Sequence, residues 1–368
     1  MPKIAVDIDA YVIPDDHLVF KCSPGKTYRF YLAVREAKAV FPDIRGLDTL
    51  EGSPDRWTDQ EMLEVIAVDR WERELQSRER GNKESGTEGI SAVDKRTLTF
   101  LKRLFFEGKK GDIVVVPAEG YDKEIMIGEF LSEPGDVRPF VAKDGDYQGV
   151  YFGRPVRWLA FVPKLNLDLD LIDALHARAA VYVLGRTLAE QVYRLAYSNF
   201  VFRGVYVAEF RTAKEHFTAE DSAVLFTWLN GFDWARYELE QHGKLPTQMG
   251  FTTMGLERVP DGKATELRIN IQSPGEIYVR SRTPFPLVLM AMFALAACDA
   301  QEVVDQGVTV HLKTVGGGGA ETRAEVEENL NATAIAFGAE RLEDANRHGV
   351  RARDGARMST RARLNPRP

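Results

Sequence analysis

Apolar residues recur at helical spacing between Lys95 and Phe106. Short runs of consecutive apolar, often β-branched residues follow. The helical stripe consists of Leu98, Leu101, Leu104 and Phe105. The run from Ile113 to Val116 is bounded by glycine and proline and predicts a buried strand. Ile125 to Phe130 is its expected hairpin partner, and Gly128 within it predicts a bulge or a close backbone approach. We expect this pair to form two walls of a small barrel, and Val156 to Pro163 to form a third strand.

The segments around this core have their own patterns. Alternation predicts strands at Ile4 to Val12 and Leu18 to Phe20. Thr58 and Glu61 have the spacing of a capping box, so a long helix is expected to run to Arg80. Residues 132–153 read as a loop, and helices are expected at 169–184 and 187–197.

The second half predicts a mixture of strands and helices. Strands are expected at 201–210, 266–271, 276–281 and 308–314, with a Pro-Gly turn at 273–275 between the middle two. Helices are expected at 218–241, 285–298 and 321–347. The apolar run at 285–298 is too short to span a bilayer, which needs about 20 apolar residues, and it predicts a buried core helix.

A length of 368 residues predicts two domains. The first is expected to span residues 1–200 with an insertion at about 45–93, and the second to span 201–348. The Arg-rich tail at 349–368 is expected to be disordered when alone. Residues 81–89 predict a polar loop, either a loose connection or a lid, and the glycines at 316–319 predict a hinge.

Composition narrows the class of protein. With 44% hydrophobic and 28% charged residues the chain is typical of soluble globular proteins, and its net charge of -7 argues against strong non-specific coating of DNA. Cys22 and Cys298 are far apart, so neither a disulfide framework nor a cysteine zinc site is expected. The first residues do not match a signal peptide, and a cytoplasmic location is therefore expected. No cofactor is predicted.

Several motifs resemble one family in order and spacing. A Phe-containing helix leads into GDIVVVP, IMIGEF follows a short turn, and RPVRWL precedes VPKLNLDLDLIDAL. In these motifs the chain resembles the EVE-like domains of the PUA superfamily, as found at the N-terminus of Mrr-type modification-dependent restriction endonucleases. Those domains are small β-barrels that cradle a flipped or modified base in an aromatic-lined pocket. The resemblance covers the first half only. It implies an α+β chain with an N-terminal PUA/EVE-like barrel, flanking helices and a second α+β domain.

The resemblance also implies a site and a function. The candidates for the base pocket are Phe30, Tyr31, Pro117, Tyr147, Tyr151 and Trp158. The candidates for phosphate contacts are Arg138, Arg154 and Arg157. The implied function is nucleic-acid sensing in bacterial defence against phage or foreign DNA, with DNA favoured over RNA and no membrane partner. We also expect a homo-oligomer, and a protein partner from a defence operon is an open prediction. From the residues alone, the aromatic side chains equally predict packing, and the arginines equally predict ion pairs with neighbouring acids.

No catalytic motif stands out. The chain lacks a Gly-x-Ser-x-Gly elbow and an HExxH motif. Glu209, His216, Asp221 and Glu266 remain candidates for a site that folding assembles. Asp7 and Asp9 share one face of the first strand, where a solvated strand face is favoured over a metal site. The alternatives to a sensor are an effector enzyme, a nuclease or nucleotide-processing protein, with its site in the second half, or a barrel that binds a small ligand or a partner protein.

Overall fold

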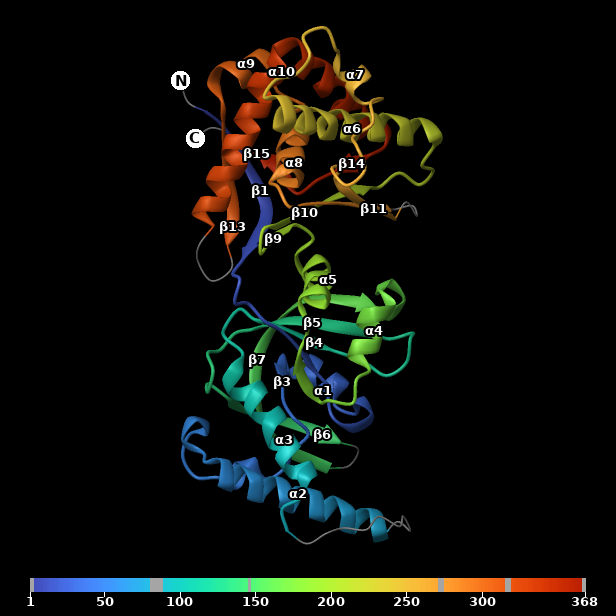
Figure 1. Cartoon of the computed structure of the whole chain (residues 1–368). Helices are drawn as coiled ribbons and strands as arrows, with labels where there is room; N and C mark the ends of the chain where they lie inside the picture. Colours follow the sequence, from blue (N-terminus) through green and yellow to red (C-terminus); the bar gives the residue numbers. More distant parts are fainter. Residues whose placement is uncertain (1–2, 80–88, 145–146, 271–274, 315–318, 366–368) are drawn as a thin grey trace. The chain divides into compact units, whose positions relative to one another are not determined.

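The chain divides into two compact units, which Figure 1 colours along the sequence. This computed structural model describes residues 3–79, 89–144, 147–270, 275–314 and 319–365. The insert unit is Asp16–Ala196. The host unit joins Met1–Asp15 to Tyr197–Pro368. Each unit combines helices with its own sheet, which confirms the α+β class.

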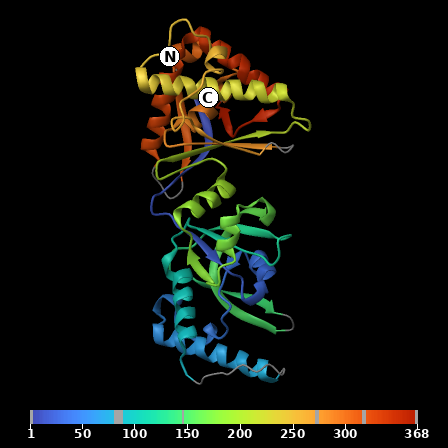
Figure 2. The ribbon, with the colours of Figure 1, turned by 45° about the vertical axis from the view of Figure 1, so that its right-hand side comes forward.

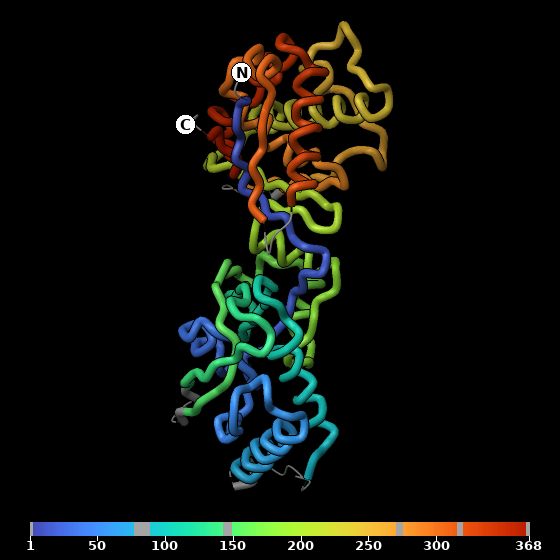
Figure 3. Tube along the Cα trace, turned by 90° about the vertical axis from the view of Figure 1, so that its left-hand side faces the viewer, coloured from blue at the N-terminus to red at the C-terminus, as the bar shows by residue number. Residues whose placement is uncertain are grey.

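The first strand belongs to the host unit, although the expected first domain at 1–200 had placed it with the barrel. β1 (Ile4–Ile13) pairs in parallel with β13 (Val308–Thr314) and β9 (Phe200–Phe202), and antiparallel with β15 (Ala362–Leu364). Figure 3 shows β1 in blue beside the orange β13. Every second side chain of β1 is buried in the host core, so this strand is a central part of the host sheet.

The host sheet has the strand order β11-β12-β10-β9-β1-β13, with β14 paired to β10 and β15 paired to β1. The single strand expected at 201–210 is a hairpin of β9 and β10, because Arg203 and Gly204 both take positive φ in a tight turn. The remaining strands of this sheet are β10 (Val205–Thr212), β11 (Glu266–Asn270), β12 (Gly275–Ser281) and β14 (Met358–Ser359).

Helices cover one face of the host sheet, as Figure 2 shows for the yellow α6 and the red α10. Thr218 caps α6 through a reciprocal bond with Asp221. The expected core helix is confirmed, since all but one of its residues are buried. The helices are α6 (Ala219–His242), α7 (Phe251–Met254), α8 (Phe285–Leu295), α9 (Ala300–Gln306) and α10 (Ala320–Gly355).

The described part of the C-terminal tail, residues 349–365, is ordered, contrary to the expected disorder. Helix α10 continues to Gly355, and β14 and β15 then join the host sheet. The Thr212 hydroxyl donates a hydrogen bond of 2.6 Å to the Ala356 carbonyl. Ala352, Ala356 and Met358 are buried between the arginines. These few buried apolar residues fix the tail. The expectation of disorder rested on the overall Arg-rich composition, which does not show where single apolar residues are buried.

The insert unit contains a curled, open sheet where a closed barrel was expected. Its order is β3-β7-β5-β4-β2-β8, with β6 paired to β7. β7 (Tyr147–Pro163) is long enough to pair with β6, β3 and β5 in turn, which curls the sheet around the core. Among the described strands the path ends at β3 and β8. The other strands are β2 (Val19–Cys22), β3 (Ala39–Val40), β4 (Ile113–Val116), β5 (Glu124–Phe130), β6 (Arg138–Asp144) and β8 (Val181–Val183).

Two expectations for this unit are wrong. Residues 132–153, expected to be a loop, contain β6 and the start of β7, which form a hairpin. The helix expected at 169–184 ends as α4 (Leu169–Leu175), because Val181 to Val183 pair with β2 instead. The β-branched and aromatic residues of β8 favour a strand, and its pairing partner lies far away in the sequence.

The helices of the insert unit surround its sheet. Within the expected insertion, Thr58 and Glu61 bond reciprocally and start a long helix, as predicted. The α-helices besides α4 are α1 (Tyr31–Ala37), α2 (Asp59–Glu79), α3 (Ala92–Lys102) and α5 (Arg186–Tyr197). Shorter helical turns are η1 (Lys26–Tyr28), η2 (Leu47–Thr49), η3 (Pro54–Arg56), the π-helical η4 (Arg103–Glu107) and η5 (Lys164–Asn166). Some expected features lie mostly outside the described residues. These parts are 81–88 of the loop or lid expected at 81–89, 273–274 of the turn at 273–275, and 316–318 of the hinge at 316–319.

Candidate functional site

A bulge in β7 brings two aromatic side chains onto one face of the insert sheet. Gly128 pairs with Trp158 and Met126 pairs with Phe161, and the register shifts between Ile127 and Gly128. The extra residue on β7 reverses the alternation. Trp158 and Phe161 therefore point to the same side, with ring centroids 6.3 Å apart.

Gly128 lets the Trp158 ring lie flat against β5. A Cβ on Gly128 would stand 2.8 Å from Cε3 of the indole, which is closer than any side chain tolerates. The bulge predicted at this glycine is confirmed by the register shift, and the close contact is with the indole ring. The indole Nε1 also donates a hydrogen bond of 3.1 Å to the Arg35 carbonyl. Trp158 is thus held in place on one ring face and one edge while it stays partly exposed.

Helix α1 completes this surface. The Tyr31 hydroxyl donates a hydrogen bond of 2.9 Å to the Glu124 carbonyl, and the Arg35 guanidinium lies 4.5 Å from the centroid of Phe161. Phe161 is 37% exposed and has the Arg35 guanidinium and the Trp158 ring as neighbours. We call Tyr31, Arg35, Trp158 and Phe161 the aromatic face. Sequence reasoning missed Arg35 and Phe161, because only the bulge and the helix place them beside Trp158.

Two of the predicted pocket residues lie in the core instead. Phe30 and Tyr151 are fully buried, with ring centroids 4.8 Å apart, and both pack against Phe41. Neither ring is accessible to a base without a rearrangement of the core. Pro117 is buried at the end of β4. Tyr147 begins β7, but its side chain lies outside the described part.

Arg154 is a structural residue, contrary to the prediction of a phosphate contact. Its side chain is fully buried, and its guanidinium lies 4.1 Å from the centroid of Phe130. It donates hydrogen bonds to the carbonyls of Gly108 and Ser132 and a longer one to that of Leu104. Burial lowers the pKa of this guanidinium to about 10. Arg154 therefore joins the η4 segment to the sheet.

The other two predicted phosphate contacts are at the surface and bound to acids. Arg157 pairs with Glu129 at 2.7 Å and Arg138 pairs with Asp136 at 3.2 Å, and the two arginine side chains are more than half exposed. Surface pairs of this kind contribute little stability. Both guanidinium groups can exchange their carboxylate for a phosphate at small cost.

Two buried ammonium groups and a neighbouring imidazole lie where four segments of the insert unit meet. Lys164 of η5 is buried, donates a hydrogen bond to the Ala118 carbonyl, and places its Nζ 3.3 Å from Nε2 of His176. Lys21 of β2 is also buried and donates to the carbonyls of Ala177 and Ala179 at 3.1 and 2.6 Å. We call Lys21, Lys164 and His176 the cation cluster. It was not predicted, because its members follow no common motif. Lys21 and Lys164 are 143 positions apart, and Lys164 and His176 are 12 positions apart.

Aromatic rings surround the cation cluster. Lys164 Nζ lies 5.8 Å from the centroid of Tyr28, and Lys21 Nζ lies 5.8 Å from that of Tyr182. Tyr121, which is 58% exposed, packs edge-on against His176. Burial lowers the pKa of Lys21 to about 8 and also lowers that of Lys164. Burial and the Lys164 charge lower the pKa of His176.

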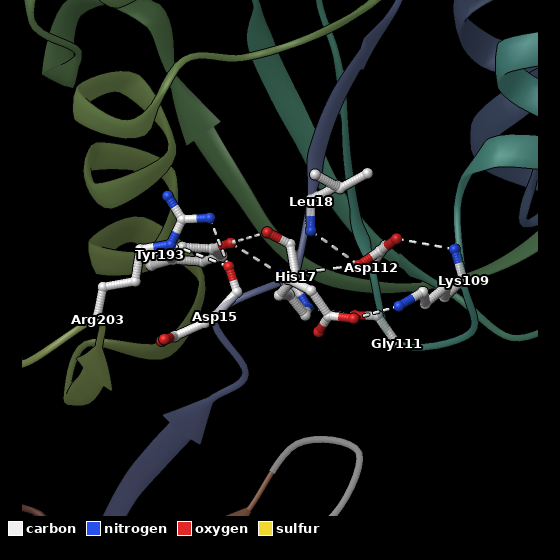
Figure 4. Close-up of polar contacts among 9 residues, drawn as sticks. Asp15, His17, Leu18, Lys109, Gly111, Asp112, Tyr193 and Arg203 are labelled. Carbon is white, nitrogen blue, oxygen red and sulfur yellow. Dashed lines mark hydrogen bonds and ion pairs between the residues drawn. The ribbon is translucent and has the colours of Figure 1, made fainter.

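Figure 4 shows a second buried polar group, centred on His17. Its Nε2 bonds the Gly111 carbonyl at 2.8 Å and its Nδ1 lies 2.9 Å from the Tyr193 hydroxyl. The Asp112 carboxylate accepts from the backbone N–H groups of Leu18 and Lys109. Because these bonds are internal and fix β2 beside β4, this group has a structural role.

The host unit does not bring the predicted catalytic candidates together. Glu209 pairs with Arg211, Asp221 with Lys214 as part of the α6 cap, and Glu266 with Arg280. Asp7 bonds His311 and Asp9 bonds Lys313, each at 2.7 Å, as expected of a solvated strand face. In the described ranges, no three His, Cys, Asp or Glu side chains are grouped as metal ligands are.

A groove of about 480 Å³ crosses the open face of the host sheet at β1. Its lining includes Arg361 and Arg363 from the tail and Lys313, together with the carboxylates of Asp7 and Asp9. Arg361 and Arg363 therefore lie at the strand β15 and line this groove, where the sequence had predicted a disordered tail.

Comparison with known proteins identified no related protein. No family model, curated protein or solved structure matches this chain. Within the described residues, no helix has both the length and the apolar character that crossing a membrane requires.

Proposed function

We propose that the insert unit binds nucleic acid and reads an extruded or modified base on the aromatic face. The observation that supports this proposal best is the Trp158 ring, which lies flat against Gly128 and is anchored by Arg35. A rigid, partly exposed ring is suited to stacking on a base, and such stacking contributes about 1–3 kcal/mol per base.

The neighbours of Trp158 fit the same role. Arg35 stacks on the exposed Phe161, and a guanidinium plane can stack on a base or meet a phosphate. Arg157, which precedes Trp158 on the strand, points to the opposite face of the sheet and offers an exposed charge for the phosphate backbone rather than for the base. This arrangement supports a sensor in which a few stacking contacts supply most of the affinity, as the acidic net charge of -7 also requires.

The setting we propose is bacterial defence against phage or foreign DNA, with DNA as the ligand and the host unit as the part that responds. That setting rests on the motif resemblance of residues 95–184. The open sheet of the insert unit is compatible with a variant of such a base-reading domain. The aromatic face carries Tyr31, Trp158 and Phe161, whereas Phe30 and Tyr151 lie in the core.

The test is binding of the full chain to a labelled oligonucleotide, measured by fluorescence anisotropy. Trp158→Ala removes the stacking ring and is expected to weaken binding by about 5- to 150-fold, which corresponds to 1–3 kcal/mol. Trp158→Phe keeps a ring and is expected to retain most of the affinity. Leu256→Ala, which removes a 77% exposed side chain of the host unit, is the control. Equal binding by Trp158→Ala and the control would contradict the proposal.

A further inference from the structure

The cation cluster has buried positive charge without a matching negative charge. Lys21 and Lys164 are each 1% exposed. Within the described ranges, no carboxylate lies within 4 Å of either ammonium group, and the hydrogen-bond partners of Lys21 are backbone carbonyls. Glu119 and Asp122 act on Lys164 only from a longer distance. Buried charges are normally paired, because an unpaired one costs several kcal/mol.

The two ammonium groups approach one short turn from its two ends. Lys164 meets the His176 ring, while Lys21 meets the carbonyls of Ala177 and Ala179 just after it. Burial lowers the pKa of His176, and the charges of Lys164 and Lys21 lower it further. The charges therefore reinforce each other at the 176–179 turn.

The cluster retains unused hydrogen-bond donors. An ammonium group has three N–H donors. Lys21 uses two on carbonyls, and Lys164 uses one on Ala118 and directs another toward His176. His176 itself is exposed, as are Ala177 and Arg178 beside it. His176 is the exposed member of the cluster, and Tyr121 and Tyr28 lie beside it and beside Lys164, so a small ligand would approach from the His176 side.

The geometry points to an oxyanion-binding site at Lys21, Lys164 and His176, with a phosphate group as its ligand. A phosphate has several acceptor oxygens and supplies the missing negative charge. It can be free inorganic phosphate or the phosphate of a nucleotide, since both present the same group. This site is separate from the aromatic face and does not require that the protein read a base.

The experiment is isothermal titration calorimetry of the full chain at constant ionic strength, so that general salt effects cancel. The titrants are inorganic phosphate, a nucleoside 5′-monophosphate and the same nucleoside without phosphate. We expect saturable binding of one or both phosphate ligands and none of the nucleoside. Similar affinities for both ligands indicate that the phosphate group alone is recognised, whereas a clear preference for the nucleotide indicates a nucleic-acid source.

Variants assign the binding to the cluster. Lys164→Met and His176→Ala are each expected to lower phosphate affinity at least tenfold, and Lys21→Met is a further variant if it folds. The matched control is Lys123→Met, which removes a 62% exposed lysine that pairs with Asp122 in the adjacent turn. Absence of saturable binding by either phosphate ligand would overturn the inference. Undiminished binding by Lys164→Met and His176→Ala would do the same. Trp158→Ala should bind phosphate normally, so this result is independent of base reading.

Discussion

Nδ1 of His17 lies 2.9 Å from the hydroxyl oxygen of Tyr193, a residue 176 positions further along the chain. The other ring nitrogen, Nε2, faces the Gly111 carbonyl at 2.8 Å, and a carbonyl can only accept. Nε2 therefore carries the proton, and Nδ1 of the neutral ring accepts from Tyr193. Figure 4 shows how this pair fixes the start of β2 against α5.

The neutral His17 predicts acid sensitivity. Burial lowers its pKa, against the opposing charge of Asp112 at 3.9 Å. Below the unfolded-state pKa of about 6.5, the unfolded chain binds a proton that the folded chain does not, so the free energy of unfolding falls as the pH falls. We expect the wild type to lose more stability between pH 7 and pH 5 than His17→Gln, measured by urea unfolding.

Asp112 also contributes to the pH dependence of stability in that experiment. Burial raises the pKa of its carboxyl group, so its contribution changes with pH in the opposite direction. His17→Gln also removes the His17 charge, which lowers the pKa of Asp112, so the difference between the two proteins reports the His17–Asp112 pair. Parallel pH profiles of the wild type and His17→Gln would show that His17 does not titrate on unfolding.

Gly128→Ala tests whether the orientation of Trp158 matters. The new Cβ would lie 2.8 Å from the indole and force the ring away from β5. We expect a loss of about 1–3 kcal/mol of stability, as in other overpacked sites, and weaker oligonucleotide binding at a temperature where the variant is folded. Gly185→Ala, where a Cβ meets nothing within 4 Å, is the matched control. Unchanged binding by Gly128→Ala would argue against a role for the fixed ring.

Substitutions of Arg154 and Arg157 should have different effects, one on stability and the other on binding. Arg154→Met leaves the buried carbonyls of Gly108 and Ser132 without their donor, and each such loss costs about 1–3 kcal/mol. Arg157→Met removes only a surface pair, worth about 0–1 kcal/mol. Thermal unfolding should therefore respond to Arg154→Met, whereas anisotropy should show weaker nucleic-acid binding for Arg157→Met. The reverse pattern would show that these roles are assigned wrongly.

The free energy of unfolding should rise in mild alkali, because the buried Lys21 then loses its charge. Burial lowers its pKa to about 8, whereas an unfolded lysine has a pKa near 10.5. Between these values the unfolded state binds more protons, so the free energy of unfolding rises with pH, by up to about 3 kcal/mol. Lys21→Met should lack this rise in chemical unfolding measured from pH 8 to pH 10. Saturating phosphate should reduce the rise in the wild type, because a bound anion favours the charged amine.

The sequence predicted best the elements whose pattern is local. The boundaries of β4 and β13 agree with the apolar runs at 113–116 and 308–314, and the caps of α2 and α6 agree with their Thr-x-x-acid spacing. Gly128 was identified for the right reason, because a glycine within a strand indicates close contact.

Long-range pairing accounts for the main errors. Nothing near β1 in the sequence shows that its partners are β13 and β15, more than 300 positions away. The same holds for β8, whose short apolar run was absorbed into the helix before it.

Of the predicted site residues, only some are accessible at the surface. Trp158 and Tyr31 lie on the aromatic face, while Phe30, Tyr151 and Arg154 are core residues. Burial of an aromatic or arginine side chain depends on what packs against it, and residue type alone does not determine that. The bulge that places Phe161 beside Trp158 has no local sequence signal except Gly128 on the partner strand.

The most direct measurement is fluorescence anisotropy of the full chain against matched oligonucleotides with plain and modified cytosines at two salt concentrations. If the aromatic face reads a base, the chain prefers one modified oligonucleotide, and this preference survives the higher salt because stacking contacts do not release counterions. Binding that ignores the modification and disappears at the higher salt would contradict base reading and would leave only charge contacts, such as those of Arg361 and Arg363.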